Sequence, residues 1–464
     1  MRTHELPPAP ETPADAPDSP EPPVEPDAGT PLTHDPLSRR GFLRAAAVTG
    51  TGLVAASVAA CAPGAAPIWT YGPGRSSDPN APAPTPSPAG SAAASPTMDH
   101  ASPAPSEAPS ASPSTEVPTG WTDHDVNARR VVRRYLGNLV PALAGIYPEP
   151  VVTKLADILG VADNYPELSQ KPSFAQVPNL VLSDALTPLE PEIDGDTKVF
   201  RLTVEEMDWQ IDELLPPVKA LGYNGQWPGP TIRVNQGDKV RAIFRNNLQE
   251  TTSVHFHGVE FEDFFMDGVP FVTEKPGIPG EDHVYEFTAV NAGSLMYHSH
   301  HNATDQVGRG LLGAFIVDPP QPQVPYDREY IWISNDTLGG FTINGHGFPA
   351  VVPVLAAQGE RVLIRFMNEG IMMHPWHSHG FAMELVARDG IPLGTAAHRA
   401  DTFAVNPGER WDAVITADRL GVWAFHCHIL PHVEGPDGMF GMVTALVVVP
   451  TKEDVDAIVQ AIVA

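Results

Sequence analysis

The chain has 464 residues, and its 28 basic and 56 acidic residues give a formal net charge of -28. This excess of negative charge argues against a nucleic-acid partner and favours the attraction of cations. The length would allow about three domains of about 150 residues each, but the composition of the N-terminal quarter leaves room for fewer.

The N-terminal 61 residues have the pattern of an export signal. Arg39 and Arg40 precede a mildly apolar stretch that is too short and glycine-rich for a membrane span. The stretch ends in Val-Ala-Ala-Cys61, which resembles a lipobox; the alternative is an ordinary signal peptide with an incidental thiol. We therefore predict a signal over residues 1–61, export by the twin-arginine pathway, and an extracytoplasmic protein that is lipid-anchored through Cys61 at the cell surface or in the periplasm.

Two segments without a strand pattern follow the signal. Residues 62–120 contain runs such as APAPTPSPAGSAAASPT, which cannot bury enough apolar surface to offset the entropy of ordering, so we predict a disordered linker. Residues 121–194 contain VNARRVVRRYLGNLV and TKLADILG, whose apolar positions recur at helical spacing with arginines on the other face. We interpret this segment as a helical lead-in that packs on the folded body, rather than as a membrane-surface element.

From about Thr197 onward, short β-type runs such as KVFRLTV, KVRAIF and RVLIRF alternate with turns rich in glycine, proline and asparagine. Regularly spaced short strands favour β-sandwiches over α/β units. We predict an all-β fold with two Greek-key sandwich domains, over residues 195–320 and 321–452, and a C-terminal tail over 453–464. The two halves look like duplicated units.

Four His-x-His pairs are distributed over these two domains. On an extended segment, a spacing of two places both imidazoles of a pair on one face, where they can reach adjacent metal ions. One such pair is weak evidence, but four make a chance origin very unlikely. The pairs are His255 and His257, His298 and His300, His377 and His379, and His426 and His428.

The last pair encloses Cys427, which points to the opposite face of the same strand. A thiolate joined by imidazoles suits copper, and a His2Cys set with a weak methionine ligand is an electron-transfer pattern. His374 and His432 are the natural imidazoles for this set. Cys61 is the only other cysteine, so neither cysteine looks structural.

These motifs resemble those of the multicopper oxidases, the laccase-like enzymes, over roughly residues 195 to 450, including NGQWPGPTIRVNQGD and MDGVP. The resemblance implies cupredoxin-like domains and four coppers per functional unit: one type 1, one type 2 and two type 3. A reducing substrate, either a phenol or another aromatic compound or a metal ion, would give single electrons to the type 1 copper at a solvent-reachable His432. Dioxygen would be reduced to water by four electrons at the other three coppers.

The resemblance also distributes the ligands. It gives the type 1 copper to His374, Cys427 and His432, and the type 2 copper to His255 and His377. It gives the type 3 coppers to His257, His298, His300, His379, His426 and His428.

Two further positions are less clear. The loop after His432 is longer than in relatives, so the axial ligand of the type 1 copper is Met439, which we prefer, or Met442; either methionine could instead fill the core. Asp267 in MDGVP matches a carboxylate that relatives use as a proton relay, and its alternative is a turn aspartate before a glycine.

The absence of a middle domain implies an oligomer. This sequence resembles the two-domain members of the family, in which three subunits close a ring and each three-copper site forms between domain one of one chain and domain two of its neighbour. Ser299, between His298 and His300, implies that domain one has no type 1 site. We therefore predict a homotrimer.

Two other functions compete with this prediction. A copper nitrite reductase would carry its cysteine site in domain one, and a non-enzymatic copper-binding or electron-transfer cupredoxin would need only one site. Four His-x-His pairs exceed the needs of either. The reductant itself, a phenol or Cu(I), Fe(II) or Mn(II), stays open.

Overall fold

The computed structural model describes residues 120–136, 139–160, 188–212, 215–337 and 340–463. The predicted signal residues Arg39, Arg40 and Cys61 lie outside the described residues, as do the predicted linker up to residue 119 and positions 161–187 of the lead-in. None of the helices in the described part of the chain has the length and apolar character needed to cross a bilayer.

The first sandwich consists of two sheets. One contains β1 (Glu192–Asp194), β2 (Thr197–Trp209), β5 (Lys239–Asn246) and β7 (Asp282–Thr288) in this order, with β3 (Val218–Tyr223) paired to β2. The other has the order β4 (Gly229–Asn235), β9 (Leu312–Asp318), β8 (Gly293–His298) and β6 (His255–His257). Strand β5 illustrates the pattern: Val240, Ala242 and Phe244 are buried and alternate with more exposed residues, as expected of a strand with one face on the core.

The second sandwich also has two sheets. One has the order β11 (Thr342–Ile343), β10 (Arg328–Asn335), β13 (Arg361–Asn368), β19 (Arg410–Thr416), β15 (Met383–Arg388) and β16 (Ile391–Pro392), with β17 (His398–Ala400) paired to β15. The other has the order β12 (Val354–Ala357), β23 (Val443–Val449), β20 (Gly421–Cys427), β14 (His374–Ser378) and β18 (Thr402–Val405). The predicted all-β class with two sandwich domains is confirmed.

Short elements complete these domains. They are η4 (Phe264–Met266), α5 (Ala303–Gln306), η5 (Gly394–Ala396), η6 (Leu430–His432) and the hairpin of β21 (Glu434–Gly435) and β22 (Gly438–Met439).

The two sandwiches share one strand plan. In the first, β2 pairs in parallel with β5 and β4 with β9; in the second, β10 pairs in parallel with β13 and β12 with β23. The histidine-bearing strands are antiparallel neighbours in both, β6 with β8 and β14 with β20. Equivalent residues therefore occupy equivalent places in the two domains.

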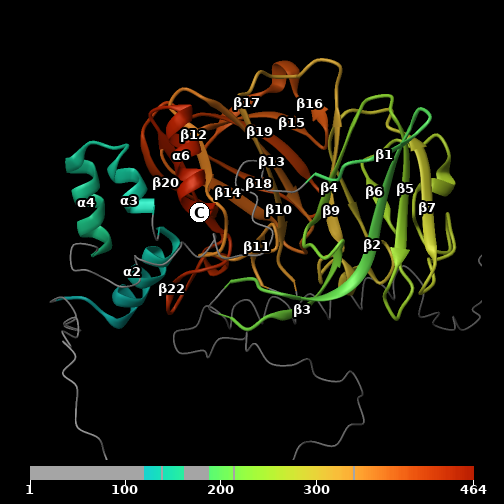
Figure 1. The fold of residues 1–464 in the computed structure, drawn as a ribbon, viewed down its shortest axis with the longest axis horizontal. Coiled ribbons are helices and arrows are strands. Elements are labelled where there is room, and N and C mark those ends of the chain that lie inside the picture. Colours follow the sequence, from blue (N-terminus) through green and yellow to red (C-terminus); the bar gives the residue numbers. More distant parts are fainter. Residues whose placement is uncertain (1–119, 137–138, 161–187, 213–214, 338–339, 464) are drawn as a thin grey trace, which may run out of the picture. The chain divides into compact units, whose positions relative to one another are not determined.

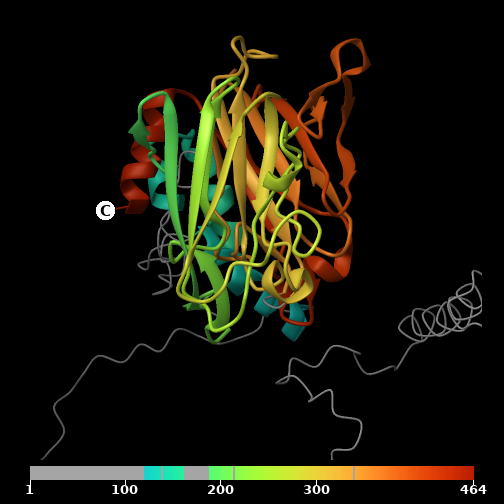
Figure 2. The same cartoon turned by 90° about the vertical axis from the view of Figure 1, so that its right-hand side faces the viewer.

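The lead-in contains three helices, α2 (Asp123–Leu136), α3 (Leu139–Ala144) and α4 (Glu149–Leu159). They lie beside the second sandwich, on the side away from the first (Figures 1 and 2). Their residues Tyr135, Leu143 and Leu159 belong to its core, as the sequence predicted for a lead-in that packs on the body. One expected surface residue differs: Arg133 is buried, and its Nε donates to the Leu159 carbonyl.

The segment predicted as a C-terminal tail is a helix, α6 (Lys452–Val463). Its Val455 and Ile458 are buried in the core of the second sandwich, and it contacts β12, β23 and α3. This helix and the lead-in together cover β23, every residue of which is buried, on both faces of the strand.

The interface between the sandwiches has an apolar part and an ionic part. Trp209, Trp227 and Met296 of the first domain pack with Ile333 and Met367 of the second. Arg365 Nη1 donates to Ser294 Oγ at 2.8 Å and to Asp412 Oδ2 at 2.9 Å, and all three side chains are buried. Ser294 Oγ also donates to Asp412 Oδ1 at 2.5 Å, so this one hydroxyl of the first domain is bonded to both members of a buried ion pair of the second.

The attachment of the lead-in can be tested at Tyr135. Its hydroxyl lies 3.0 Å from Thr444 Oγ1 and accepts the Ala445 N–H at 3.2 Å. Tyr135→Phe removes this buried bonding group, so we expect the free energy of unfolding to fall by about 1–3 kcal/mol, measured by denaturant titration. Tyr326→Phe is the control, because the half-buried Tyr326 hydroxyl makes no hydrogen bond in the described part of the chain. Equal stability of the two variants would contradict the attachment.

Candidate metal centres

Strands β14 and β20 separate two sets of side chains. Trp376 pairs with Cys427 and His377 with His426, so the residues facing the core and those facing out line up across the two strands. Cys427 and His374 are buried, whereas His426 is half-buried. One pair of strands thus serves an internal site and a surface site.

The internal site brings together the predicted cysteine and two predicted histidines. Cys427 Sγ lies 3.8 Å from His374 Nδ1 and 3.6 Å from His432 Nδ1. All three residues are buried, and their ligand atoms lie within 4.8 Å of one another. A soft thiolate between two imidazoles is a donor set suited to copper.

Asp336 orients one of these imidazoles, and no motif in the sequence marks it. Its Oδ2 lies 3.2 Å from His374 Nε2, while its two oxygens accept the N–H groups of Ile371 at 2.7 Å and Met372 at 2.8 Å. Burial opposes the charge, but the bonds from His374 and these N–H groups outweigh it and keep the pKa of Asp336 below its usual value. The His374 ring is thereby held with Nδ1 toward Cys427.

Burial also sets the protonation of the apoprotein. It raises the pKa of the Cys427 thiol to about 11 and lowers the pKa of His432 to about 4. Without metal the site therefore contains a neutral thiol and a neutral imidazole, and metal binding must displace the thiol proton.

His432 is not solvent-reachable, so this expectation from the sequence is wrong. Only 3% of the residue is exposed, and the Phe341 ring stacks on its imidazole with centroids 4.0 Å apart. Phe341 comes from the loop after β10, far away in the chain, and no motif marks it.

The extra residues after His432 form the β21–β22 hairpin. The Phe440 N–H donates to the Val433 carbonyl at 3.0 Å, and the Met442 N–H donates to the His432 carbonyl at 3.1 Å. The start and the end of the hairpin therefore lie side by side, next to His432. Met442 is fully buried and its carbonyl accepts the Cys427 N–H at 3.1 Å, whereas Met439 stands on the hairpin opposite Glu434 and is 40% exposed.

The hairpin is held by the lead-in helix α2. His124 Nδ1 lies 2.9 Å from the Pro436 carbonyl, and Asn127 Nδ2 donates to Asp437 Oδ1 at 3.3 Å. Gly438 has a φ of +101°, and a Cβ there would come within 2.6 Å of Ala128 Cα, so only glycine allows this close approach.

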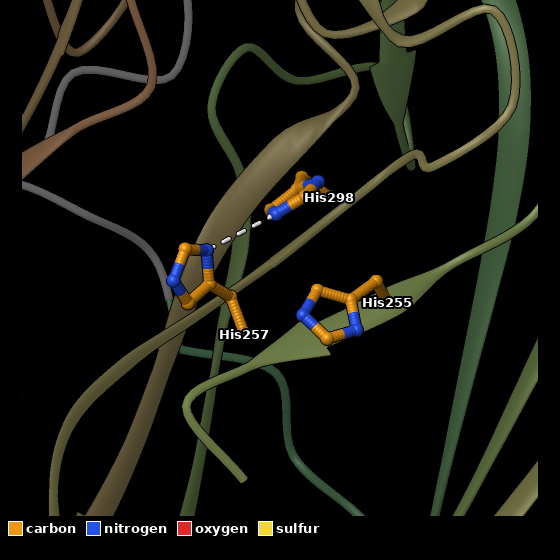
Figure 3. A group of neighbouring side chains, drawn as sticks. All are labelled: His255, His257 and His298. Atoms are coloured by element: carbon orange, nitrogen blue, oxygen red, sulfur yellow. Dashed lines mark hydrogen bonds between the residues drawn. The ribbon is translucent and has the colours of Figure 1, made fainter. Parts of the chain in front are cut away.

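The first surface set, here the first quartet, consists of His255, His257, His298 and His300. Figure 3 shows three of its rings turned toward one another from β6 and β8. His257 Nδ1 lies 3.3 Å from His298 Nε2. His255 Nδ1 lies 2.7 Å from the Asp267 carbonyl and 3.3 Å from Asp267 Oδ1, which leaves its Nε2 for a metal. The predicted Asp267 therefore lies beside the quartet.

The second quartet consists of His377, His379, His426 and His428 at the ends of β14 and β20. His379 Nε2 and His426 Nε2 lie 3.0 Å apart. The other ring nitrogens of two members are engaged: His426 Nδ1 lies 2.8 Å from the Cys427 carbonyl, and His377 Nδ1 lies 2.8 Å from Thr402 Oγ1. These bonds fix which nitrogen of each ring is free to bind metal.

Both quartets are open to the surface. His300, His379 and His428 are exposed, and the other members are half-buried. Among the residues that the structure describes, the ring contacts between these histidines stay within each quartet. The two quartets are therefore separate from each other within the described part of the chain.

The first sandwich has a hydrogen-bonded network where the second has the thiolate site. Ser299 stands between two quartet histidines as Cys427 does, and Thr252 precedes His255 at the spacing by which His374 precedes His377. Ser299 Oγ donates to Gln306 Oε1 at 2.6 Å and Thr252 Oγ1 donates to it at 2.9 Å, and all three residues are buried. The described part of the first sandwich thus has no cysteine copper site, which argues against the nitrite reductase alternative.

Comparison with known proteins agrees with this geometry. Two adjoining family models, both described as multicopper oxidase, match residues 203–322 and 324–451. A solved structure, the multicopper oxidase mgLAC, is 34% identical, with a TM-score of 0.51 over 55% of this chain and 88% of its own. The predicted cupredoxin-like fold is confirmed by this likeness.

Curated relatives match over a smaller part. The iron transport multicopper oxidase FET5 of Saccharomyces cerevisiae is 30% identical over 43% of this chain and 36% of its own length. Laccase-2 of Podospora anserina is 30% identical over 48% of this chain and 40% of its own length. The chain thus spans well under half of these relatives.

Proposed function

Because this chain belongs to the multicopper oxidase family, we propose that it couples the one-electron oxidation of a reducing substrate to the four-electron reduction of dioxygen to water. The observation that carries the proposal is the shared strand β20, which has the buried Cys427 on one face and His426 of the second histidine quartet on the other. Electrons accepted at Cys427 would have a direct covalent route to His426 and His428.

The donor atoms fit copper at both places. We assign His374, Cys427 and His432 to a type 1 copper, which would supply one-electron transfer when bound. The two quartets would hold one type 2 and two type 3 coppers, which together supply oxygen reduction. We assign the type 2 ion to His255 and His377, and the type 3 pair to His257, His298, His300, His379, His426 and His428.

Three side chains next to the proposed copper ligands would support these functions. Asp336 fixes His374, and Asp267 fixes His255 and is placed to exchange protons with solvent, since its side chain is 38% exposed. Phe341 excludes water from His432. A reductant must therefore give its electron through or beside the Phe341 ring.

For the axial ligand we propose Met442 in place of Met439. Met442 is buried beside the backbone of both Cys427 and His432, whereas Met439 points from an exposed hairpin. From the sequence we preferred Met439 because it follows Gly438 and precedes a Phe-Gly-Met-Val run that resembles the closing strand of the family, but Gly438 and Met439 belong to the hairpin that α2 holds.

The reductant is a small aromatic compound or a metal ion. Relatives of both kinds occur, since one is named an iron transport oxidase and the other a laccase. The net negative charge favours cationic reductants.

We also propose that the protein is exported by the twin-arginine pathway and anchored through lipid on Cys61. The support is the motif itself, Arg39 and Arg40 before an apolar stretch that ends in Cys61.

The open quartets support a homotrimer in which each oxygen-reducing site forms between two chains. The loop that contains Asp267 also exposes Phe264, Phe265, Phe271 and Val272, the last two by 80% and 72%. Adjacent exposed apolar side chains are typical of a protein interface. A partner that covers this loop would bring its second quartet to the first.

The oxidase activity is tested by oxygen uptake of the copper-loaded protein with a phenol, Fe(II) and Cu(I) as reductants. We expect at least one reductant to drive oxygen uptake.

Cys427→Ser should remove the intense blue absorption and the oxygen uptake while the quartets still bind copper. His257→Ala should keep the blue absorption and lose uptake. Full copper loading without uptake for any reductant would refute the proposal.

The axial assignment predicts different effects for two matched variants. Met442→Leu removes a donor that stabilises Cu(II), so the reduction potential of the blue copper should rise and its absorption should change. Met439→Leu should leave both unchanged. Redox titration followed at the blue band measures this, and the opposite result would return the assignment to Met439.

The trimer predicts a sedimentation coefficient for three chains. In a variant with Phe271→Asp and Val272→Asp we expect monomers that keep the blue absorption, because the type 1 site lies within one sandwich, but that lose oxygen uptake. Analytical ultracentrifugation and uptake assays check both. A monomer with wild-type uptake would disprove the shared site.

A further inference from the structure

A cavity of about 380 Å³ joins the first quartet to the second sandwich of the same chain. One side is formed by the four histidines and by α5 and its neighbouring residues; the opposite side is formed by Thr337, Glu369, Gly370, Ile371 and Gly408. A Cβ at Gly408 would lie 3.2 Å from His257 Cε1, so the two sides meet closely. Buried hydrogen bonds join Ser294 of the first sandwich to Arg365 and Asp412 of the second and link the two sandwiches.

Glu369 is the one acidic side chain among the residues that line this cavity. Its backbone is fixed, because its N–H donates to the Ser334 carbonyl at 2.9 Å and its carbonyl accepts Asn335 Nδ2 at 3.3 Å. Its Oε1 is enclosed and has no hydrogen-bond partner among the described residues, while the residue as a whole keeps some exposed surface. Buried carboxyl oxygens are normally bonded, so an unbonded one beside a metal site calls for a functional explanation.

Among the described residues, no charged side chain forms an ion pair with Glu369. Arg410 is the nearby cation, and its guanidinium donates to the Gly408 carbonyl at 2.8 Å and to the Ser294 carbonyl at 3.2 Å. Asp336 lies against Gly370 and faces His374, and the buried Tyr223 hydroxyl is neutral. Burial raises the pKa of Glu369 to about 8, although Arg410 lowers it, so the carboxyl carries its proton at neutral pH.

We propose that Glu369 is a proton donor for oxygen reduction at the first quartet. The inference rests on the proposed oxidase function and deepens it. Reduction of one dioxygen to two waters takes four electrons, which come from four one-electron oxidations of the reductant, and four protons. In the step that uses Glu369, its carboxyl O–H bond breaks, the proton passes to the oxygen under reduction, and the carboxylate takes a new proton from solvent in the open cavity.

Asp267 and Glu369 have distinct places in this scheme. Asp267 is bonded to His255 at the outer edge of the quartet, where it orients the ring. Glu369 lines the cavity on the side opposite the quartet, and its enclosed Oε1 has no hydrogen-bond partner among the described residues.

The first test separates the two halves of the reaction in the copper-loaded protein. In Glu369→Gln we expect reoxidation of the fully reduced protein by dioxygen to slow on the order of 10²-fold, the usual contribution of a positioned acid. Anaerobic reduction of the blue copper by the same reductant should keep its wild-type rate. Glu369→Asp should be reoxidised faster than Glu369→Gln, because it keeps a carboxyl group. The ratio of its reoxidation rates in water and in deuterium oxide should exceed that of the wild type.

The control is Glu281→Gln, which removes an exposed carboxylate of the first sandwich outside this cavity. It should match the wild type in both half-reactions. Wild-type reoxidation in a fully loaded Glu369→Gln variant would overturn the inference. Loss of copper from Glu369→Gln and Glu369→Asp alike would assign a structural role and overturn it too.

A second measurement does not depend on activity. Infrared spectra of the copper-free protein at neutral pH should contain the C=O band of a protonated carboxyl that persists in Glu281→Gln and is missing in Glu369→Gln. A missing band in the wild type would overturn the inference. A wild type that keeps this band but never reduces dioxygen would instead refute the proposed oxidase function, and the donor role with it.

Discussion

The two-residue repeat of one strand pair is the constraint on which the rest of this structure depends. Because side chains of β14 and β20 alternate, Cys427 must point inward when His426 and His428 point out, and the pairing of Trp376 with Cys427 carries His374 inward beside it. A shift of one residue in this register would exchange the two sets. Residues that hold the register, such as those of the buried strand β23, are therefore as important to the site as its ligands.

The same constraint acts in the first sandwich with a different outcome. Its strands β6 and β8 present a quartet outward in the same way, but the inward positions hold Thr252 and Ser299, joined through Gln306. Three neutral side chains satisfy one another there without a metal, so the buried position costs little. The chain thus has an outward histidine quartet in both domains and an inward thiol site in the second.

The sequence predicted what depends on local periodicity. The two sandwiches and the faces of the four His-x-His pairs follow from spacing alone, and the structure brings Cys427 together with His374 and His432. The tertiary neighbours could not be predicted in this way. No motif marks the loop residues that contact the sites, which are Asp336, Phe341 and Glu369. Helix α6 was predicted as a tail, because the role of its apolar residues depends on their packing against β12.

The hairpin after His432 shows how such a neighbour changes an interpretation. In the sequence, Met439 is the first methionine after His432. In the structure, residues 433–440 form a hairpin that is closed by the hydrogen bond between Phe440 and Val433. Helix α2 contacts this hairpin through His124 and Asn127, and α2 in turn contacts β23 through Tyr135. The lead-in is therefore coupled to the hairpin that follows His432. A change in α2 would reach His432 through the hairpin, without any contact between the helix and the ligands.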